Sequence, residues 1–173
     1  MNPSLSRMDT LLAGNYRIVA YRDLALPYQL AIGHYMTIDG EAWSEALPDG
    51  AFWLTRAQQK RELTKCLPRL IELFGHVPFG VALLPSEAVR HAIMQMKEVA
   101  EDFPNWEAYH AWCINSGDIP DHGKDDRWPV VLSDFEDELL QDGWHRVHCY
   151  LCRGDETIPA VFYPREHHLA GQF

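Results

Sequence analysis

The chain has 173 residues, 47% of them hydrophobic and 23% charged, which is typical of one globular domain with an elaboration. No apolar run approaches the roughly 18 residues that a membrane-spanning helix requires. The first residues also lack the apolar stretch of a secretory signal. We therefore expect a cytoplasmic protein that does not span a membrane.

The formal net charge is −10, and it is unevenly distributed. Residues 1–79 carry 8 basic and 8 acidic side chains, whereas residues 80–173 carry 7 basic and 17 acidic ones. An acidic surface repels a phosphate backbone, so this distribution disfavours non-specific nucleic-acid binding. A DNA-binding face would have to be small, bridged by metal, or built from the N-terminal half.

The N-terminal part predicts two strands followed by a helix. Residues 15–24 and 28–39 are rich in aromatic and β-branched side chains, which favours a β-hairpin joined at residues 25–27. Turns are expected at residues 39–40 and 49–50, both Asp-Gly. Residues 55–74 have helical periodicity, with Thr55 as N-cap, Gly75 as the stop and Pro68 as a point of kinking or division.

The remaining chain predicts a mixed α/β domain. Residues 77–85 form a short buried strand, Ser86 caps a helix over 87–103, and a second helix follows over 105–117. A polar loop leads to a strand in 128–135, and residues 138–164 contain strand, turn, helix and strand. The order β-α-α-β-β-α-β indicates an α/β fold with a mixed sheet in residues 78–173, preceded by an elaboration in residues 1–77.

The stretch Asp142-Gly143-Trp144-His145-Arg146 lies at the predicted start of a helix. Such a start has unpaired backbone N–H groups and a partial positive charge, so it suits an anion. Gly143 allows close approach of a ligand, and Arg146 offers a fork that matches phosphate oxygens. A structural interpretation is equally open, in which Asp142 caps the helix, Gly143 turns the chain and Arg146 forms a surface salt bridge.

The sequence also resembles the ParB/sulfiredoxin superfamily over about residues 78–164. The resemblance rests on "DGWHRVHCYLCRGDETIPAVFY", together with "GVALLPSEAV" and "WPVVLSDFEDELLQDG" upstream. It implies a ParB/sulfiredoxin-like core that binds a nucleoside triphosphate at this turn. Partition CTPases, sulfinic-acid reductases, serine kinases and plasmid fertility-inhibition proteins with ATPase and nuclease activities belong to the superfamily. Trp144 stands where sulfiredoxins have their catalytic cysteine, which disfavours sulfinic-acid reduction.

The resemblance implies a nucleotide-binding set at the turn. Gly143, His145 and Arg146 would bind the phosphates, and Trp144 would stack on the base or ribose. Arg90, on the first helix of the core, would reach the phosphates. ATP or another nucleoside triphosphate is the expected ligand.

Catalysis would then require a carboxylate and Mg²⁺, as phosphoryl transfer usually does. Asp142 is the candidate metal ligand. Glu87 or Asp142 would position the nucleophile, and His145 would exchange protons near neutral pH. For Glu87 the stronger interpretation is structural, because acids favour the first turn of a helix.

Two other enzymatic or metal-binding interpretations stay open. DNA would be the substrate if the protein is a metal-dependent nuclease. His145, His148, Cys149 and Cys152 offer soft zinc ligands, although one helix rarely completes a tetrahedral site and core packing is the favoured interpretation. With Cys66 and Cys113, the two cysteines of this set are too scattered for a disulfide framework, so thiols are expected.

The rival class is a non-catalytic interaction protein. In this interpretation the protein is an inhibitor from a mobile element such as a plasmid, whose acidic face blocks a basic or nucleic-acid-binding partner.

Overall fold

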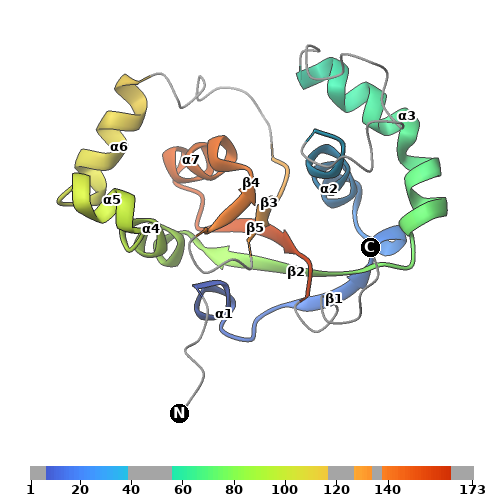
Figure 1. Ribbon diagram of the computed structural model, residues 1–173, viewed down its shortest axis with the longest axis horizontal. Helices are drawn as coiled ribbons and strands as arrows, with labels where there is room; N and C mark the ends of the chain where they lie inside the picture. Colours follow the sequence, from blue (N-terminus) through green and yellow to red (C-terminus); the bar gives the residue numbers. More distant parts are fainter. Residues whose placement is uncertain (1–6, 39–55, 117–126, 134–137, 165–173) are drawn as a thin grey trace. The chain divides into compact units, whose positions relative to one another are not determined.

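The structure is a computed structural model that describes residues 7–38, 56–116, 127–133 and 138–164. It is a mixed α/β fold (Figure 1). In chain order its elements are α1 (Arg7–Leu12), β1 (Arg17–Ala20), the 3-10 helix η1 (Tyr21–Asp23), α2 (Leu26–Ile38), α3 (Arg56–Phe74), β2 (Pro78–Pro85), α4 (Ser86–Met94), α5 (Lys97–Asp102), α6 (Trp106–Asn115), β3 (Val130–Leu132), β4 (Leu140–Asp142), α7 (Trp144–Arg153) and β5 (Thr157–Phe162).

The strands form one five-stranded sheet in the order β1-β2-β5-β3-β4. β1 pairs with β2 in antiparallel register, with Arg17 opposite Val81 and Ala20 opposite Pro78. β3 and β4 are also antiparallel, with a register shift between Val131 and Leu132. The predicted mixed sheet is therefore confirmed, including β1 and every strand expected after residue 77.

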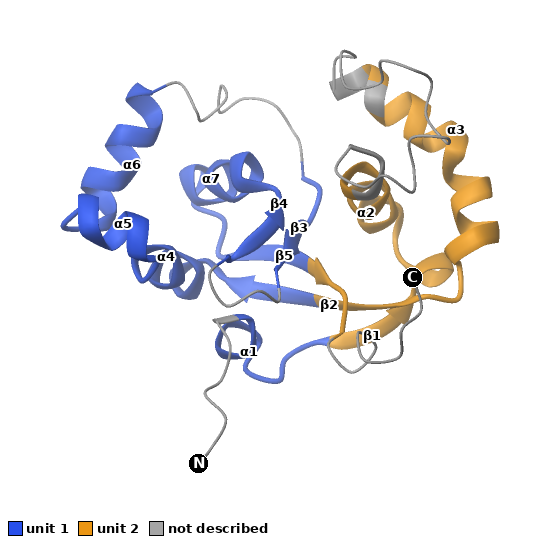
Figure 2. Cartoon of the chain, viewed as in Figure 1, with its two compact units in different colours: residues 1–16, 82–160 blue, residues 17–81, 161–173 orange. Residues whose placement is uncertain are grey.

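The chain forms two compact units, coloured separately in Figure 2. One comprises residues 1–16 and 82–160, and the other comprises residues 17–81 and 161–173. Each has its own buried side chains: Val89, Ile93, Val130, Val147 and Ile158 in the first, and Tyr21, Leu30, Leu63, Leu70 and Phe162 in the second. No helix in the described ranges is long and apolar enough to cross a membrane.

The second predicted strand, residues 28–39, is wrong, because α2 occupies Leu26–Ile38. Residues 29–33 are all buried, so this helix lacks the one-sided periodicity by which an amphipathic helix is identified. Pro27 is compatible with a helix because it lies in the first turn, where its missing N–H costs no hydrogen bond. Gly33 permits close packing on α3, since a Cβ there would stand 3.3 Å from Leu70 Cδ1.

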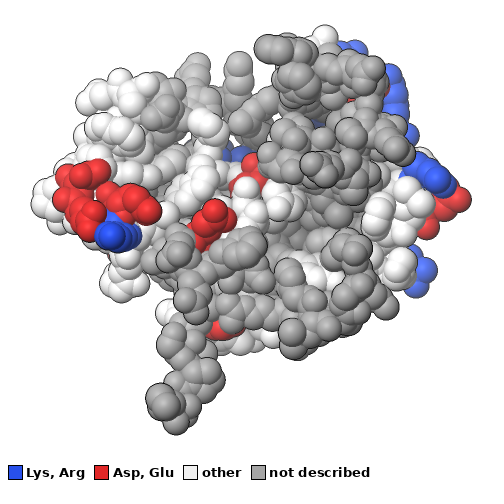
Figure 3. All heavy atoms as spheres, viewed as in Figure 1, with Lys and Arg blue, Asp and Glu red and all other residues white. Residues whose placement is uncertain are grey.

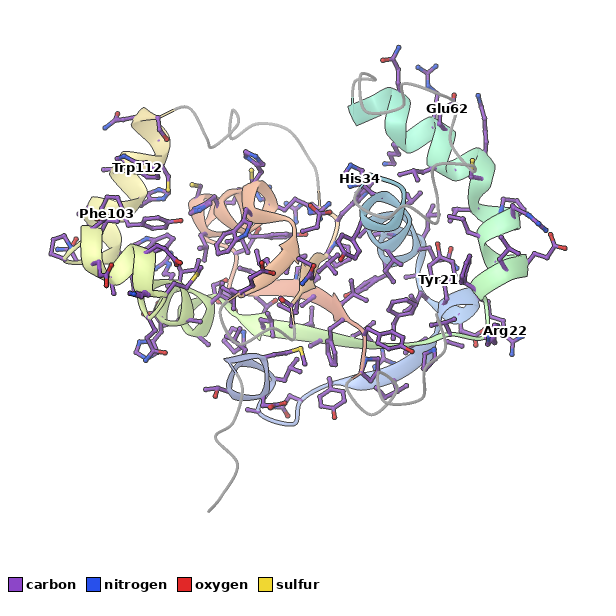
Figure 4. All side chains as sticks on the ribbon, viewed as in Figure 1. Tyr21, Arg22, His34, Glu62, Phe103 and Trp112 are labelled. Atoms are coloured by element: carbon purple, nitrogen blue, oxygen red, sulfur yellow. The ribbon has the colours of Figure 1, made fainter. Side chains whose placement is uncertain are left out.

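Buried hydrogen bonds hold the start of α2 to η1. The Tyr21 hydroxyl donates to the Gln29 carbonyl at 3.0 Å, and Gln29 Nε2 donates to the Tyr21 carbonyl at 3.1 Å (Tyr21 is labelled in Figure 4). Gln29 is only 7% exposed, so these bonds satisfy groups that burial would otherwise leave without water. Burial also raises the pKa of the Tyr21 hydroxyl, which therefore stays protonated as a donor.

The helix predicted for residues 55–74 is confirmed as α3, and Pro68 lies inside it without dividing it. The helix ends at Phe74, and the Gly75 N–H donates to the Ile71 carbonyl at 2.8 Å. The expected N-cap Thr55 and the turns at 39–40 and 49–50 lie outside the described residues.

Two helix predictions in the core need correction. The single helix expected over residues 87–103 is divided into α4 and α5 at Gln95 and Met96. Ser86 is not a side-chain cap; it is the first residue of α4, and its hydroxyl donates to the Asp155 carbonyl at 2.5 Å. This bond and the one from the Ser86 N–H to the Glu156 carbonyl tie the start of α4 to the segment after α7.

Replacing Gly80 by alanine is expected to destabilise the protein by about 2 kcal/mol. A Cβ at this position would overlap the ring of Phe162, which is 3% exposed and has little room to move. Chemical denaturation of Gly80→Ala measures the loss. A double variant, Gly80→Ala with Phe162→Leu, should recover part of it, and no recovery would contradict this explanation.

Candidate functional site

The sharp turn between β4 and α7 is built around Gly143. β4 ends at Asp142 and α7 begins at Trp144, with Gly143 between them at φ 104° and ψ 21°. Side chains with a Cβ rarely adopt this left-handed region, so the turn requires glycine. As N-cap, Gly143 has no side-chain acceptor, and its carbonyl receives the Val147 N–H at 2.8 Å.

Arg146 forms a buried ion pair with Asp142 across this turn. Arg146 Nη2 donates to Asp142 Oδ2 at 2.9 Å, and their side chains are 5% and 23% exposed. The guanidinium lies against Gly143, because a Cβ there would be 3.0 Å from both Arg146 Nε and Nη2. Arg146 Nε is buried and has no hydrogen-bond partner. The salt bridge expected under the structural interpretation is therefore present, but it is buried and lies against Gly143.

Two further side chains of the turn reach solvent. His145 is exposed and Trp144 is half-buried. The first turn of α7 adds backbone N–H groups and the positive end of the helix dipole. These N–H groups suit an anion, whereas the charge of Arg146 is buried and compensated by Asp142.

Glu87 and Arg90 lie on α4, in the same compact unit as the turn. Glu87 is 88% exposed in the first turn of α4, and its Oε2 is 3.6 Å from Arg90 Nη1. Arg90 is 35% exposed and extends towards α6, with Cζ 5.7 Å from the ring centroid of Trp106. Arg90 Nε is buried without a hydrogen-bond partner.

The acidic run before the turn is only partly described. Glu136 and Asp137 lie outside the described residues. Glu138 is exposed, and its Oε2 accepts from Gln141 Nε2 at 3.3 Å and from Ser133 Oγ at 3.4 Å. This carboxylate therefore takes part in a local polar network at the ends of β3 and β4.

Sequence reasoning did not bring together a second cluster of polar side chains, which lies in the seam where α6 meets α7. His148 Nε2 lies 3.3 Å from the Tyr109 hydroxyl and 4.0 Å from Cys113 Sγ, and all three residues are buried. One turn along each helix, Cys152 Sγ lies 3.5 Å from His110 Nε2. Two thiol–imidazole pairs thus cross between the helices.

Aromatic rings cover the same seam. The Trp106 ring stacks on the rings of His110 and His148, with centroids 5.4 and 6.1 Å apart. Phe103 packs against both Tyr109 and Trp112 at 5.3 and 5.4 Å (Phe103 and Trp112 are labelled in Figure 4). Tyr109 is 8% exposed, whereas Trp112 is 50% exposed, so only part of this aromatic stretch is buried.

Burial has the largest effect on the pKa values of His148 and Tyr109 in this seam. Burial and, to a smaller extent, the nearby His110 and His145 together lower the pKa of His148 from 6.5 to about 4. Burial raises the pKa of Tyr109. His148 is therefore neutral in the folded protein at physiological pH. In the described part of the chain, no three histidine, cysteine or acidic side chains are arranged to hold a metal ion.

No protein-family model, curated protein or solved structure matches this chain.

Proposed function

We propose that the protein binds a nucleoside triphosphate with Mg²⁺ at the Gly143–Arg146 turn, and hydrolyses it or transfers its terminal phosphoryl group. The observation that carries this proposal is the buried guanidinium of Arg146, held against a left-handed glycine at the N-terminus of α7. The resemblance of residues 78–164 to the ParB/sulfiredoxin superfamily supports the same ligand.

The chemistry at the turn follows from where each group lies. Backbone N–H groups of the first turn of α7 and the exposed His145 would meet the phosphate oxygens, while Arg146 would supply positive charge from below. The half-buried Trp144 would stack on the base or ribose. Asp142 would hold Mg²⁺, provided that the metal competes with Arg146 for its carboxylate.

The nucleophile requires a carboxylate to position it. Asp142 lies at the turn itself and Glu87 lies in the first turn of α4, in the same unit. Asp142→Asn and Glu87→Gln, compared for hydrolysis rate, would distinguish the two. Mg²⁺ would neutralise charge on the phosphates during transfer.

Nucleotide binding should depend on two residues of the turn, the exposed His145 and the buried Arg146. We expect His145→Ala and Arg146→Lys each to weaken the binding of one nucleotide with Mg²⁺ by about tenfold, or about 1.4 kcal/mol. Calorimetry with ATP, CTP, GTP and ADP would identify the base. Neither variant removes the positive charge of Arg146, so both should fold, as thermal unfolding would verify.

As a control, His91→Ala removes an exposed histidine on α4 and should leave the affinity unchanged. Equal affinity in wild type, His145→Ala and Arg146→Lys would contradict the proposed site. Plasmid digestion with and without EDTA would test the nuclease variant of the proposal.

A non-catalytic role is the second candidate, favoured by the exposed acidic side chains of α5. Glu98, Glu101 and Asp102 are all exposed there, beside a single lysine, and Figure 3 shows acidic groups gathered over this element. Such a surface would attract a basic partner. Absence of nucleotide binding, together with salt-sensitive binding of a basic protein, would favour this role.

A further inference from the structure

The Cys152–His110 pair is the part of the α6–α7 seam that solvent reaches. Cys152 and His110 are both half-buried, with Sγ 3.5 Å from Nε2. The other pair, Cys113 and His148, is buried. A thiol in contact with an imidazole has a base that can accept its proton, which is the arrangement that activates a sulfur nucleophile.

Two guanidinium groups lie around this thiol. Arg153 follows Cys152 in the chain, and Arg90 extends from α4 over Trp106, whose ring stacks on His110. Burial raises the pKa of the Cys152 thiol, and both arginines act electrostatically in the opposite direction. Arg90 Nε and Arg153 Nη2 are buried and have no hydrogen-bond partner.

These arginines are only partly compensated by carboxylates. Arg153 Nε binds Asp155 Oδ2 at 3.0 Å, whereas Arg90 faces the highly exposed Glu87 at 3.6 Å. Arg90 is 35% exposed and Arg153 is 18% exposed, so a ligand carboxylate would meet the solvent-facing N–H groups of Arg90 first. The site therefore suits a small molecule that carries both an acidic group and an electrophilic centre.

We propose that Cys152 is a modification site that undergoes thiol–disulfide exchange with small acidic disulfides, which Arg90 and Arg153 bind through their carboxylates. His110 takes the Cys152 proton, and the thiolate attacks one sulfur of the disulfide. A new S–S bond forms to Cys152 while the ligand's own S–S bond breaks. The departing thiolate takes the proton from His110, so Cys152 is oxidised and the released thiol is the reduced product.

His110 is needed because the thiol is not ionised beforehand. Burial raises the pKa of Cys152, and this effect exceeds the lowering by Arg153 and Arg90. A thiolate of raised pKa is also the stronger nucleophile once its proton has been removed. The pair thus combines a protonated resting thiol with a base in contact with it.

Three disulfides of different charge test the proposal on the full-length protein: glutathione disulfide, which is acidic; hydroxyethyl disulfide, which is neutral; and cystamine, which is cationic. Because the chain carries a net charge of −10, an ordinary exposed thiol should react fastest with cystamine. Cys149 lies on the same helix and is also half-buried, so it serves as the internal reference. Peptide mass mapping measures the adduct at each cysteine over time.

At Cys152 we expect glutathione disulfide to react about tenfold faster than cystamine, the reverse of the order at Cys149. Arg90→Gln should abolish this preference, whereas Arg69→Gln, which removes an equal charge from exposed α3, should retain it. His110→Asn should slow all three disulfides at Cys152 alone. The proposal is overturned if Cys152 prefers cystamine, if it reacts with none of the three, or if Arg90→Gln leaves the preference intact in a normally folded protein.

Discussion

Gly143→Ala is expected to lower the free energy of unfolding by about 3 kcal/mol and to displace Arg146 from its position in the candidate site. The backbone conformation, φ 104°, costs a residue with a Cβ about 1–2 kcal/mol. The added Cβ would also lie 3.0 Å from two guanidinium nitrogens of Arg146 and 3.1 Å from Val130 Cγ1. Since Val130 is fully buried, Arg146 has to move, and its buried bond to Asp142 is weakened.

Gly154→Ala separates the cost of the backbone conformation from the cost of the steric overlap with neighbouring side chains. Gly154 ends α7 with φ 72°, and nothing lies within 4 Å of the position its Cβ would take. This variant should lose only the backbone contribution, about 1 kcal/mol. Denaturant unfolding of both variants gives the comparison. Equal losses would contradict the inference that the Arg146 guanidinium fills the space over Gly143.

The turn was predictable from sequence because its determinants are local. Asp-Gly before a helical pattern predicts strand, turn and helix within a few residues. The pairing of Arg146 with Asp142 was harder to foresee. These residues are four positions apart on either side of the left-handed Gly143, and the Arg146 guanidinium packs against that glycine.

In a fully buried segment, the residue types can indicate the wrong secondary structure. Residues 28–39 look like a strand because aromatic and β-branched side chains dominate them, yet α2 buries five consecutive positions, 29–33. A helix surrounded by other elements has no polar face to produce a 3.6-residue period. Pro27 in the first turn was the available signal for a helix start.

The α6–α7 seam lay beyond sequence reasoning for a different reason. His148 meets Tyr109 and Cys113 across sequence separations of 39 and 35 residues, and His110 meets Cys152 across 42. Each pair depends on the register between two packed helices. Periodicity shows which face of a helix is buried, but it does not show which residue of another helix lies opposite.

His148, in the α6–α7 seam, should make the free energy of unfolding fall at acidic pH. His148 has a pKa of about 4 when folded and an ordinary value of 6.5 when unfolded. Above pH 6.5 the ring is neutral in both states, so it contributes no pH dependence. As the pH falls from 6.5 to 4, the unfolded chain binds a proton that the folded protein does not, and stability is lost. This difference corresponds to about 3 kcal/mol.

The cause of that loss is the environment of the ring. His148 is 5% exposed, its Nδ1 has no hydrogen-bond partner, and its neighbours are Tyr109, Cys113 and the imidazoles of His110 and His145. None of these neighbours is an acid that would stabilise an imidazolium. Protonation therefore places an uncompensated charge between α6 and α7.

His148→Phe tests this explanation, because phenylalanine keeps a ring against Trp106 but cannot bind a proton. We expect its free energy of unfolding, measured from pH 7 to pH 4, to fall by about 3 kcal/mol less than that of the wild type. His91→Phe, on an exposed histidine of α4, controls for the loss of one histidine. If wild type and His148→Phe lose stability in parallel over this range, His148 is not the group that links acid to unfolding. If only the wild type and His91→Phe lose this stability between pH 7 and pH 4, acid acts on the contact between α6 and α7. The same contact holds His110 against Cys152.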